Sequence, residues 1–223
     1  MTKCKYIIMC GGVYQQWETP RHLTLINEQS LITRTFNFLI DNGVEYEDIF
    51  VSTNNGVIQN YCESIAIQVL WHNKNDWVVP RPGVSTGDWC DAFYPTDEPT
   101  TYLMGDVVFS PEAIKTIVET KTDDIEFFAS APPFAKNYMK PYAEPFAFKV
   151  VNTEHLKQAQ ADCRHFHRLG MFKREPIAWE FWQVVKCTEL NKIDYTNYTV
   201  INDYTCDIDV PADTKKIERL ING

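Results

Sequence analysis

Two glycines, Gly11 and Gly12, directly follow the first apolar stretch of the sequence, which ends at Cys10. Glycines at the end of a strand allow backbone amides to approach an anionic ligand closely, so a turn of this kind can cradle phosphate groups. A tight turn that binds nothing explains the two glycines equally well. The sequence therefore makes this turn a candidate anion site and leaves its use open.

Acidic residues occur at two further places of interest. Asp106 follows Gly105 at the end of an apolar run, and Asp207 and Asp209 lie just before Pro211. A strand that ends in Gly-Asp places a carboxylate where the ligands of α/β sheets bind, but such an aspartate is often only a turn former or a helix cap. The later pair equally fits a helix N-terminus with dipole-compensating acids and proline in its first turn.

A loop-like stretch from 78 to 89 combines proline, glycine, serine and threonine with one arginine. A loop of glycine and hydroxyl residues before a helix can hold a base edge or a phosphate through its amides and hydroxyls. The candidates in this stretch are Arg81, Gly83, Ser85 and Thr86.

The elements that must position these residues follow from hydrophobic periodicity. Short apolar runs predict strands at 6–10, 48–53, 67–71, 101–105, 126–131, 145–151 and 198–202. Helical spacing predicts helices at 30–42, 111–121, 152–163, 176–190 and 211–222. Alternation of strand and helix in the first half favours right-handed crossovers and a mainly parallel sheet, whereas 126–151 is typical of antiparallel additions. We therefore predict a single α/β domain with a mixed central sheet flanked by helices.

Composition excludes several classes of protein. The chain has 223 residues, 44% of them hydrophobic, and a formal net charge of −9 at pH 7, which argues against a nucleic-acid partner. Its apolar runs are far shorter than the ~20 residues of a membrane helix, and no signal peptide is recognisable. The seven cysteines are never spaced Cys-x-x-Cys, a pattern typical of reduced thiols. We expect a cytoplasmic protein that binds neither nucleic acid nor membrane.

The order of these features resembles the nucleotidyltransferases of the glycosyltransferase-A-like fold, which include sugar-phosphate cytidylyltransferases and nucleotidyltransferases of molybdopterin type. The family opens with a strand, a glycine-rich loop that carries a basic residue, and Pro-Lys before a leucine and a helix. Gly11, Gly12, Pro20, Arg21 and Leu23 fit this frame. The resemblance implies a Rossmann-like fold, with a nucleotide-binding half at 1–125 and an acceptor-binding half at 126–223 that completes the metal site.

The sequence departs from the family pattern at two positions. No arginine or lysine lies between Gly12 and Pro20, where the loop offers Gln15 and Gln16 instead, and the expected lysine is Arg21. A guanidinium supplies a planar fork of donors and is not equivalent to the point charge of a lysine. The glutamines can donate hydrogen bonds but carry no charge. The resemblance therefore supports the fold more strongly than the activity.

The resemblance also implies roles for the remaining candidates. Asp106 matches the family aspartate that binds catalytic Mg²⁺ (or Mn²⁺), and Asp209, with Asp207 as the fallback, matches the acid that completes the site. Two carboxylates from distant segments suit Mg²⁺ because it prefers oxygen ligands and retains water. Arg21 would neutralise charge on the reacting phosphate. The implied nucleotide-binding residues are Cys10, Gly11, Gly12, Gln15, Gln16, Arg81, Gly83, Ser85 and Thr86.

The second half of the chain should hold the acceptor. Glu144 and Glu180 lie beside aromatic residues, a combination that suits recognition of hydroxyl or amine groups and that packing or helix capping explains equally well. Lys149 is a candidate for an acceptor phosphate, although surface lysines usually have no such role. Aromatic residues at 134–146 and 176–182 suggest a homodimer interface.

These observations favour an Mg²⁺-dependent nucleotidyltransferase. A small phosphorylated acceptor would attack the α-phosphorus of a nucleoside triphosphate, with CTP favoured, and release pyrophosphate. The expected acceptor is a sugar or polyol phosphate, or a phosphorylated amino-acid-like compound or phosphonate of surface-polysaccharide synthesis. Two alternatives stay open: a glycosyltransferase that uses a nucleotide-sugar donor, and a nucleotide-binding homologue without activity.

Overall fold

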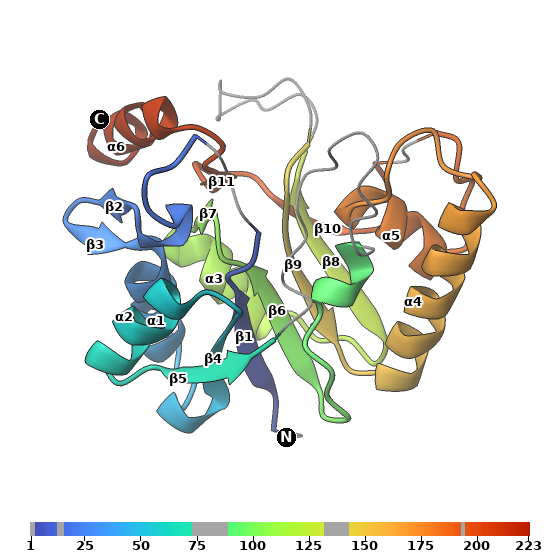
Figure 1. Cartoon of the computed structure of the whole chain (residues 1–223), viewed down its shortest axis with the longest axis horizontal. Coiled ribbons are helices and arrows are strands. Elements are labelled where there is room, and N and C mark those ends of the chain that lie inside the picture. Colours follow the sequence, from blue (N-terminus) through green and yellow to red (C-terminus); the bar gives the residue numbers. More distant parts are fainter. Residues whose placement is uncertain (1–2, 13–15, 73–88, 132–142, 193–194) are drawn as a thin grey trace.

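A seven-stranded sheet forms the centre of the computed structural model, which describes residues 3–12, 16–72, 89–131, 143–192 and 195–223 (Figure 1). Its strands are β1 (Lys5–Met9), β4 (Ile49–Thr53), β5 (Gln68–Trp71), β6 (Thr100–Met104), β8 (Ile125–Ser130), β9 (Pro145–Val150) and β10 (Thr199–Ile201). They lie in the order β10-β8-β9-β6-β1-β4-β5. Two short ladders join β2 (Leu25–Ile26) to β3 (Gln29–Ser30) and β7 (Val107–Val108) to β11 (Cys206–Asp207).

Neighbouring strands of this sheet run mostly in parallel. β1 pairs in parallel with β4 and β6, β4 with β5, and β8 with β10, whereas β9 is antiparallel to both β6 and β8. The prediction of a mainly parallel, mixed sheet with antiparallel additions is therefore confirmed. Because of these directions, the carboxyl ends of β1, β4 and β6 meet at one edge of the sheet, together with the amino end of β9.

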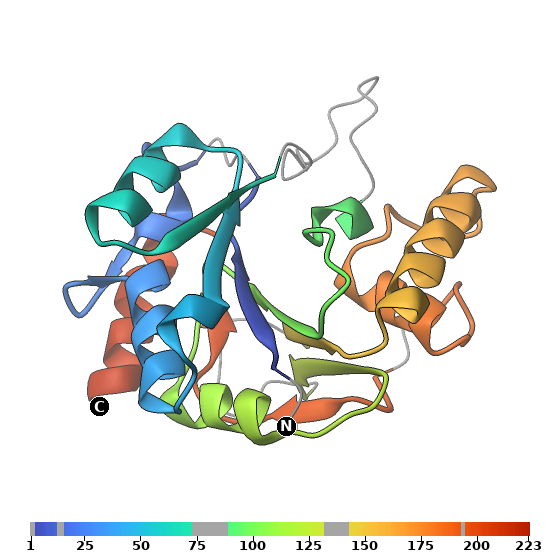
Figure 2. The same ribbon diagram turned by 90° about the horizontal axis from the view of Figure 1, so that it is seen from below.

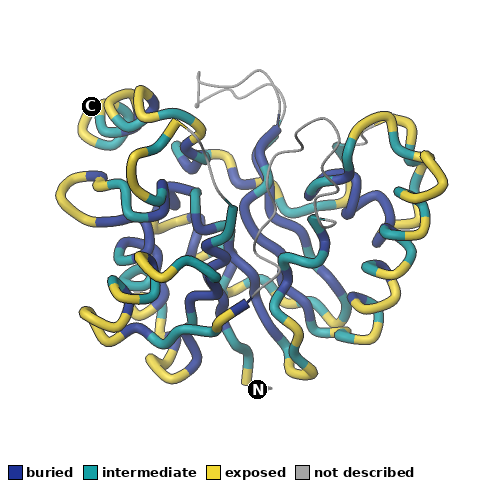
Figure 3. The backbone as a smooth tube through the Cα atoms, viewed as in Figure 1, coloured by how far each residue is buried: buried dark blue, intermediate teal, exposed yellow. Residues whose placement is uncertain are grey.

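Helices cover both faces of the sheet. They are α1 (Leu31–Asp41), α2 (Gly56–Ser64), α3 (Pro111–Glu119), α4 (Thr153–Arg168), α5 (Ala178–Val185) and α6 (Pro211–Asn222), with 3-10 turns η1 (Arg21–Leu23), η2 (Tyr46–Asp48) and η3 (Trp89–Ala92). Side chains of β1 alternate between two cores: Ile7 packs on the side of α4 and α5, and Ile8 on the side of α1 and α2. Figure 2 shows α4 and α5 across the sheet from α1 and α3. The central strands β1, β6, β8 and β9 are mostly buried (Figure 3). The single-domain α/β fold is thus confirmed.

Helix α2 is the main element that sequence periodicity did not predict. Asn54, Asn55 and Gly56 look like a turn, yet Asn55 begins the helix because its Oδ1 accepts hydrogen bonds from Val57 N at 2.9 Å and Ile58 N at 3.4 Å. Capping of this kind satisfies amides that have no partner within the helix. The residues that favour a turn therefore form a helix start.

Two helix ends differ from the expected ones by five residues each. Helix α4 continues beyond the predicted end at 163 as far as Arg168. Helix α5 ends at Val185 rather than 190, and Cys187 has a φ of 52°, a left-handed conformation that a helix cannot continue through. No helix in the described part of the chain is long and apolar enough to cross a membrane.

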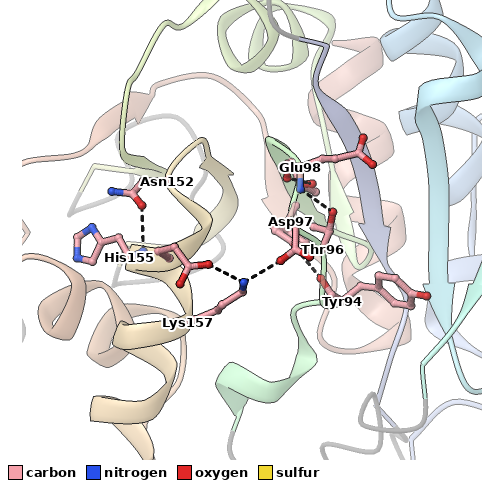
Figure 4. A network of polar contacts seen from close by, with 10 residues as sticks. Tyr94, Thr96, Asp97, Glu98, Asn152, His155 and Lys157 are labelled. Atoms are coloured by element: carbon pink, nitrogen blue, oxygen red, sulfur yellow. Dashed lines mark hydrogen bonds and ion pairs between the residues drawn. The ribbon is translucent and has the colours of Figure 1, made fainter.

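Polar contacts on the surface connect α4 to the segment before β6 (Figure 4). Lys157 Nζ donates to Asp97 Oδ1 and to Glu154 Oε1, each at 2.7 Å. His155 N donates to Asn152 Oδ1 at 3.0 Å, which caps the helix. Because solvent screens exposed ion pairs, these contacts orient α4 but contribute little to stability.

Candidate active site

Arg21 lies at the carboxyl edge of the sheet, in contact with both predicted metal-binding carboxylates. Its side chain is only 5% exposed. Nη2 donates to Asp106 Oδ2, and Nη1 donates to the carbonyl oxygen of Ile208 at 3.0 Å and lies 3.6 Å from Asp209 Oδ1. One guanidinium therefore bridges two carboxylates that are far apart in the sequence.

The ladder between β7 and β11 explains why the two carboxylates approach each other. Asp106 follows β6, the neighbour of β1 in the sheet. Val107 in β7 pairs antiparallel with Asp207 in β11, and Ile208 N donates to Asp106 O at 2.9 Å. This pairing carries Asp209 to the same edge, where β7 and β11 lie near the upper end of β1 in Figure 1.

Gly105 allows the ends of β1 and β6 to come close together at the glycine turn. Gly105 N donates to Met9 O at 3.0 Å, and a Cβ on Gly105 would lie 2.5 Å from that oxygen and 2.6 Å from Cys10 Sγ. Such distances exclude any side chain without movement of the strands. Gly12 has a φ of 87°, a conformation that glycine adopts readily. The requirement for glycine at 105 thus sets Asp106 directly beside the turn.

Cys10 and the two glycines have different roles in this turn. Cys10 N donates to Ser52 O at 2.8 Å, and its thiol is fully buried, which raises the pKa of the thiol well above its usual value. The amide and the thiol of Cys10 therefore serve strand packing rather than a ligand. Gly11 and Gly12 are half-buried, and their amides remain the candidate donors to an anion.

Trp17 is a site residue that sequence reasoning missed. Its Nε1 donates to the carbonyl oxygen of Asp209 at 3.1 Å, and its ring packs against a core cluster that includes Ile208 and Ile217. The loop after the glycine turn is thereby tied to the segment that carries Asp209. An aromatic residue in a loop gives no sequence signal for a partner so distant in the chain.

His22 lies next to Arg21 and is 2% exposed. The pKa of this imidazole is lowered to about 4, mainly by burial and in part by the Arg21 cation, while Asp106 opposes the shift. His22 is therefore neutral near pH 7, and the positive charge at this place belongs to Arg21.

Acid should destabilise the protein through His22. The unfolded chain takes up a proton on this imidazole below about pH 6.5, whereas the folded protein does so only near pH 4, so stability falls as the pH falls through that window. We expect a loss of about 2 kcal/mol from this residue between about pH 7.5 and pH 5. Urea unfolding of the parent and of His22→Gln at both pH values checks this; equal pH dependence of the two proteins would contradict it.

Lys149 is the residue whose position corrects the sequence-based expectation. Its Nζ donates to the carbonyl oxygens of Val118 at 3.0 Å and Thr120 at 2.6 Å, at the end of α3, and burial lowers its pKa. Because β9 is antiparallel to β6, Lys149 pairs with Thr101 near the start of β6, away from the carboxyl edge. Lys149 therefore satisfies helix-terminal carbonyls, and we do not retain it as an acceptor-binding residue.

The two acidic candidates of the second half are both buried. Glu144 is 5% exposed and precedes β9, where its backbone exchanges hydrogen bonds with Ser130 at 2.8 and 2.9 Å. Glu180 is 4% exposed and accepts hydrogen bonds from Arg174 Nε at 2.5 Å and Ile177 N at 3.2 Å. Glu180 thus caps α5, which is one of the roles that the sequence left open for it. Glu144 lies at the same sheet edge as Asp106.

Two aromatic residues, Trp179 and Tyr195, lie near these acids. The ring centroid of Tyr195 lies 4.8 Å from that of Trp179, whose Nε1 donates to Ala143 O at 3.0 Å. Burial raises the pKa of Tyr195, while Arg174 lowers it and Glu180 and Glu144 raise it. The charges that act on one phenol show that these groups share a corner beside the amino end of β9.

Several sequence candidates give no geometry to compare. Gln15, Arg81, Gly83, Ser85 and Thr86 lie outside the described residues. Gln16 is described and exposed. Among the described residues, no group of three or more His, Cys, Asp or Glu side chains is arranged to hold a metal ion.

The sheet order and the flanking helices define a single-domain, Rossmann-like α/β fold. An inositol-1-phosphate CTP transferase from T. maritima has this fold, with a TM-score of 0.59 at 15% identity over 99% of this chain and 95% of that chain. A CTP:phosphocholine cytidylyltransferase from Streptococcus pneumoniae gives 0.53 at 15% identity over 98% and 99%. A putative glucose-1-phosphate thymidylyltransferase from Bacillus anthracis gives 0.58 at 13% identity over 97% and 94%.

These similarities extend over nearly the whole of each chain, so they show the fold rather than a shared motif. No protein-family model matches the sequence, and no curated protein matches it either. At such low identity the activity must be argued from the site itself.

Proposed function

We propose that the protein is a nucleotidyltransferase that uses Mg²⁺ or Mn²⁺ and transfers a nucleotidyl group from a nucleoside triphosphate, with CTP favoured, to a small phosphorylated acceptor. The observation that carries this proposal is the meeting of Arg21, Asp106 and Asp209 beside the glycine turn. The carboxyl edge of a parallel sheet is where α/β proteins bind nucleotides. Three similar structures are of nucleotidyltransferases, which supports the same class of reaction.

The proposed reaction needs no general base. An oxygen of the acceptor phosphate forms a bond to the α-phosphorus, and the bond from that phosphorus to the oxygen bridging to the β-phosphate breaks. Pyrophosphate leaves with the electron pair of the broken bond. Because a phosphate monoester is already largely ionised near neutral pH, no proton has to be removed from the nucleophile. Catalysis then depends on positioning and on neutralisation of charge at the α-phosphate.

Different residues of the chain would have separate roles in this reaction. The Gly11 and Gly12 amides would approach the nucleotide phosphates, and Arg21 would place its fork of donors on the reacting phosphate or the acceptor phosphate. Trp17 would hold the loop in register with Asp209 through its hydrogen bond to the backbone of that residue.

Asp106 and Asp209 fit a divalent cation by their chemistry. Both present carboxylate oxygens, the ligands that Mg²⁺ prefers, and both already face one cationic group, the guanidinium of Arg21. The side chain of Asp209 is 47% exposed, so water can complete the coordination of an ion there. When bound, the cation would supply positive charge to the phosphate oxygens.

The acceptor proposed here is a sugar, polyol or amino-alcohol phosphate. Two of the similar structures are named for CTP and for inositol 1-phosphate or phosphocholine, and the third for glucose 1-phosphate. The corner around Glu144, Glu180, Trp179 and Tyr195 combines carboxylates with aromatic rings at the edge where the acceptor would lie. Such groups recognise hydroxyl or ammonium groups.

A screen of pyrophosphate release tests the proposal. CTP, dTTP, UTP, GTP and ATP are each combined with phosphocholine, inositol 1-phosphate, glucose 1-phosphate and related acceptors in the presence of Mg²⁺. We expect CTP to give the strongest release of pyrophosphate. This release should require both the acceptor and the metal. Hydrolysis or transfer from a nucleotide sugar with no release from any triphosphate would favour a glycosyltransferase. Binding of CTP without turnover would favour the inactive homologue.

A further inference from the structure

Arg21 is the counter-ion of Asp106 and Asp209 in this structure. Its guanidinium donates to Asp106 Oδ2 and lies 3.6 Å from Asp209 Oδ1, and its side chain is 5% exposed. A third contact, from Nη1 to Ile208 O at 3.0 Å, fixes the guanidinium between the segments that carry the acids. A divalent cation shared by Asp106 and Asp209 would have to take the same place or lie directly against the guanidinium.

Charge balance disfavours binding of both cations to these two carboxylates at the same time. Two carboxylates carry two negative charges, of which Arg21 neutralises one. A divalent ion added beside the guanidinium would be repelled by it at a distance of a few ångströms, where screening by water is incomplete. If the guanidinium moves away, the ion neutralises both carboxylates and Arg21 keeps a charge for another anion.

We propose that Arg21 and the divalent cation are alternative counter-ions of Asp106 and Asp209, and that the cation gains full access to the carboxylates only when a nucleotide triphosphate draws the guanidinium onto its phosphates. This inference rests on the proposed function. It assigns to Arg21 a control of metal entry in addition to its contact with phosphate. Metal and nucleotide then favour each other's binding, since each removes an obstacle to the other.

The surroundings of Arg21 support such an exchange. Asp209 is the more exposed of the two acids, 47% against 19% for Asp106, and it lies farther from the guanidinium. A cation can therefore approach from the side of Asp209.

Binding of Mn²⁺ to the protein in the absence of nucleotide tests the exchange. Free Mn²⁺ is followed by its electron paramagnetic resonance signal in titrations of the parent, Arg21→Gln, Arg21→Lys and Arg164→Gln. Glutamine removes the charge at Arg21 and keeps a donor for the Ile208 carbonyl. We expect Arg21→Gln to bind Mn²⁺ about tenfold more tightly than the parent, within the range of typical coupling between sites.

Two variants serve as controls for this measurement. Arg164 pairs with Asp91 on the helix α4 side of the molecule, so Arg164→Gln changes the net charge equally without touching the site. The double variant Arg21→Gln with Asp106→Asn should lose the gain in affinity, because the ion then lacks one carboxylate. Thermal unfolding shows whether each variant is folded.

Arg21→Lys keeps the test decisive if Arg21→Gln fails to fold. A lysine ammonium is a point charge that cannot hold both carboxylates and the Ile208 carbonyl as a planar fork does, so the ion should displace it more easily and affinity should rise by a smaller factor. Unchanged or weaker Mn²⁺ binding in the folded Arg21 variants overturns the inference, as does an equal gain in Arg164→Gln or no binding in any variant. The screen of pyrophosphate release uses the parent protein and no Arg21 variant. It therefore tests the proposed function independently of this inference.

Discussion

Asp106→Asn is expected to lower the rate of pyrophosphate release at least about a hundredfold while the chain stays folded. The amide keeps the size of the side chain but loses the negative charge that pairs with Arg21 and would hold the divalent ion. The measurement is kcat for the nucleotide and acceptor found in the screen, at saturating Mg²⁺, with the circular dichroism spectrum as the check of folding.

Asp48→Asn is the matched control for this variant. Asp48 is 7% exposed and forms an ion pair with Lys3 Nζ at 2.8 Å, but it lies just before β4, at the amino edge of the sheet. The same chemical change there should leave kcat within about twofold of the parent, since it is remote from the site. Parental activity in Asp106→Asn would remove Asp106 from the catalytic site.

The Asp106→Asn variant also separates activity from stability. Arg21 stays buried after the change and keeps Asp209 and the Ile208 carbonyl as partners, so we expect a loss of about 2 kcal/mol rather than the larger cost of an isolated buried charge. Urea unfolding measures this loss. A fully unfolded Asp106→Asn would show that the ion pair is first of all structural.

The sequence predicted the scaffold well because the relevant signals are local. Each strand of the sheet is a short apolar run between polar residues, and Ser110 with Pro111 marks the start of α3, where Ser110 Oγ accepts from Ala113 N at 2.9 Å. The carboxyl ends of parallel strands share an edge, so the glycine turn and Asp106 could be placed together from chain order alone. Signals of this kind need only a few neighbouring residues.

The parts that could not be predicted depend on pairs far apart in the chain. No local pattern states that Val107 pairs with Asp207, that Trp17 binds the backbone of Asp209, or that Lys149 turns to the end of α3. The ion pairs of Arg21 are of the same kind. The sequence indicated which residues form the candidate site. Their hydrogen-bond and ion-pair partners, however, are set by tertiary packing.

Gly105→Ala should lower the free energy of unfolding by about 2–3 kcal/mol, the cost of overpacking a closely packed place. The added Cβ would lie 2.5 Å from Met9 O, 2.6 Å from Cys10 Sγ and 3.1 Å from His22 Cδ2. The ends of β1 and β6 must separate to relieve these contacts, and Asp106 moves with them. For a chain of this length the melting temperature should fall by about 5–10 °C, which calorimetry measures.

Gly56→Ala is the matched control for this substitution. Gly56 begins α2, and a Cβ there would meet nothing within 4 Å, so alanine should leave stability unchanged or raise it by about 0.5–1 kcal/mol.

At Gly105 the same methyl group should also lower kcat by about a hundredfold, because a displacement of about 1 Å in a catalytic group can have that effect. Equal stability of the two variants would show that the strands relax without strain. A stable but slow Gly105→Ala would instead show that the close approach of the strands serves the placement of Asp106 more than the fold.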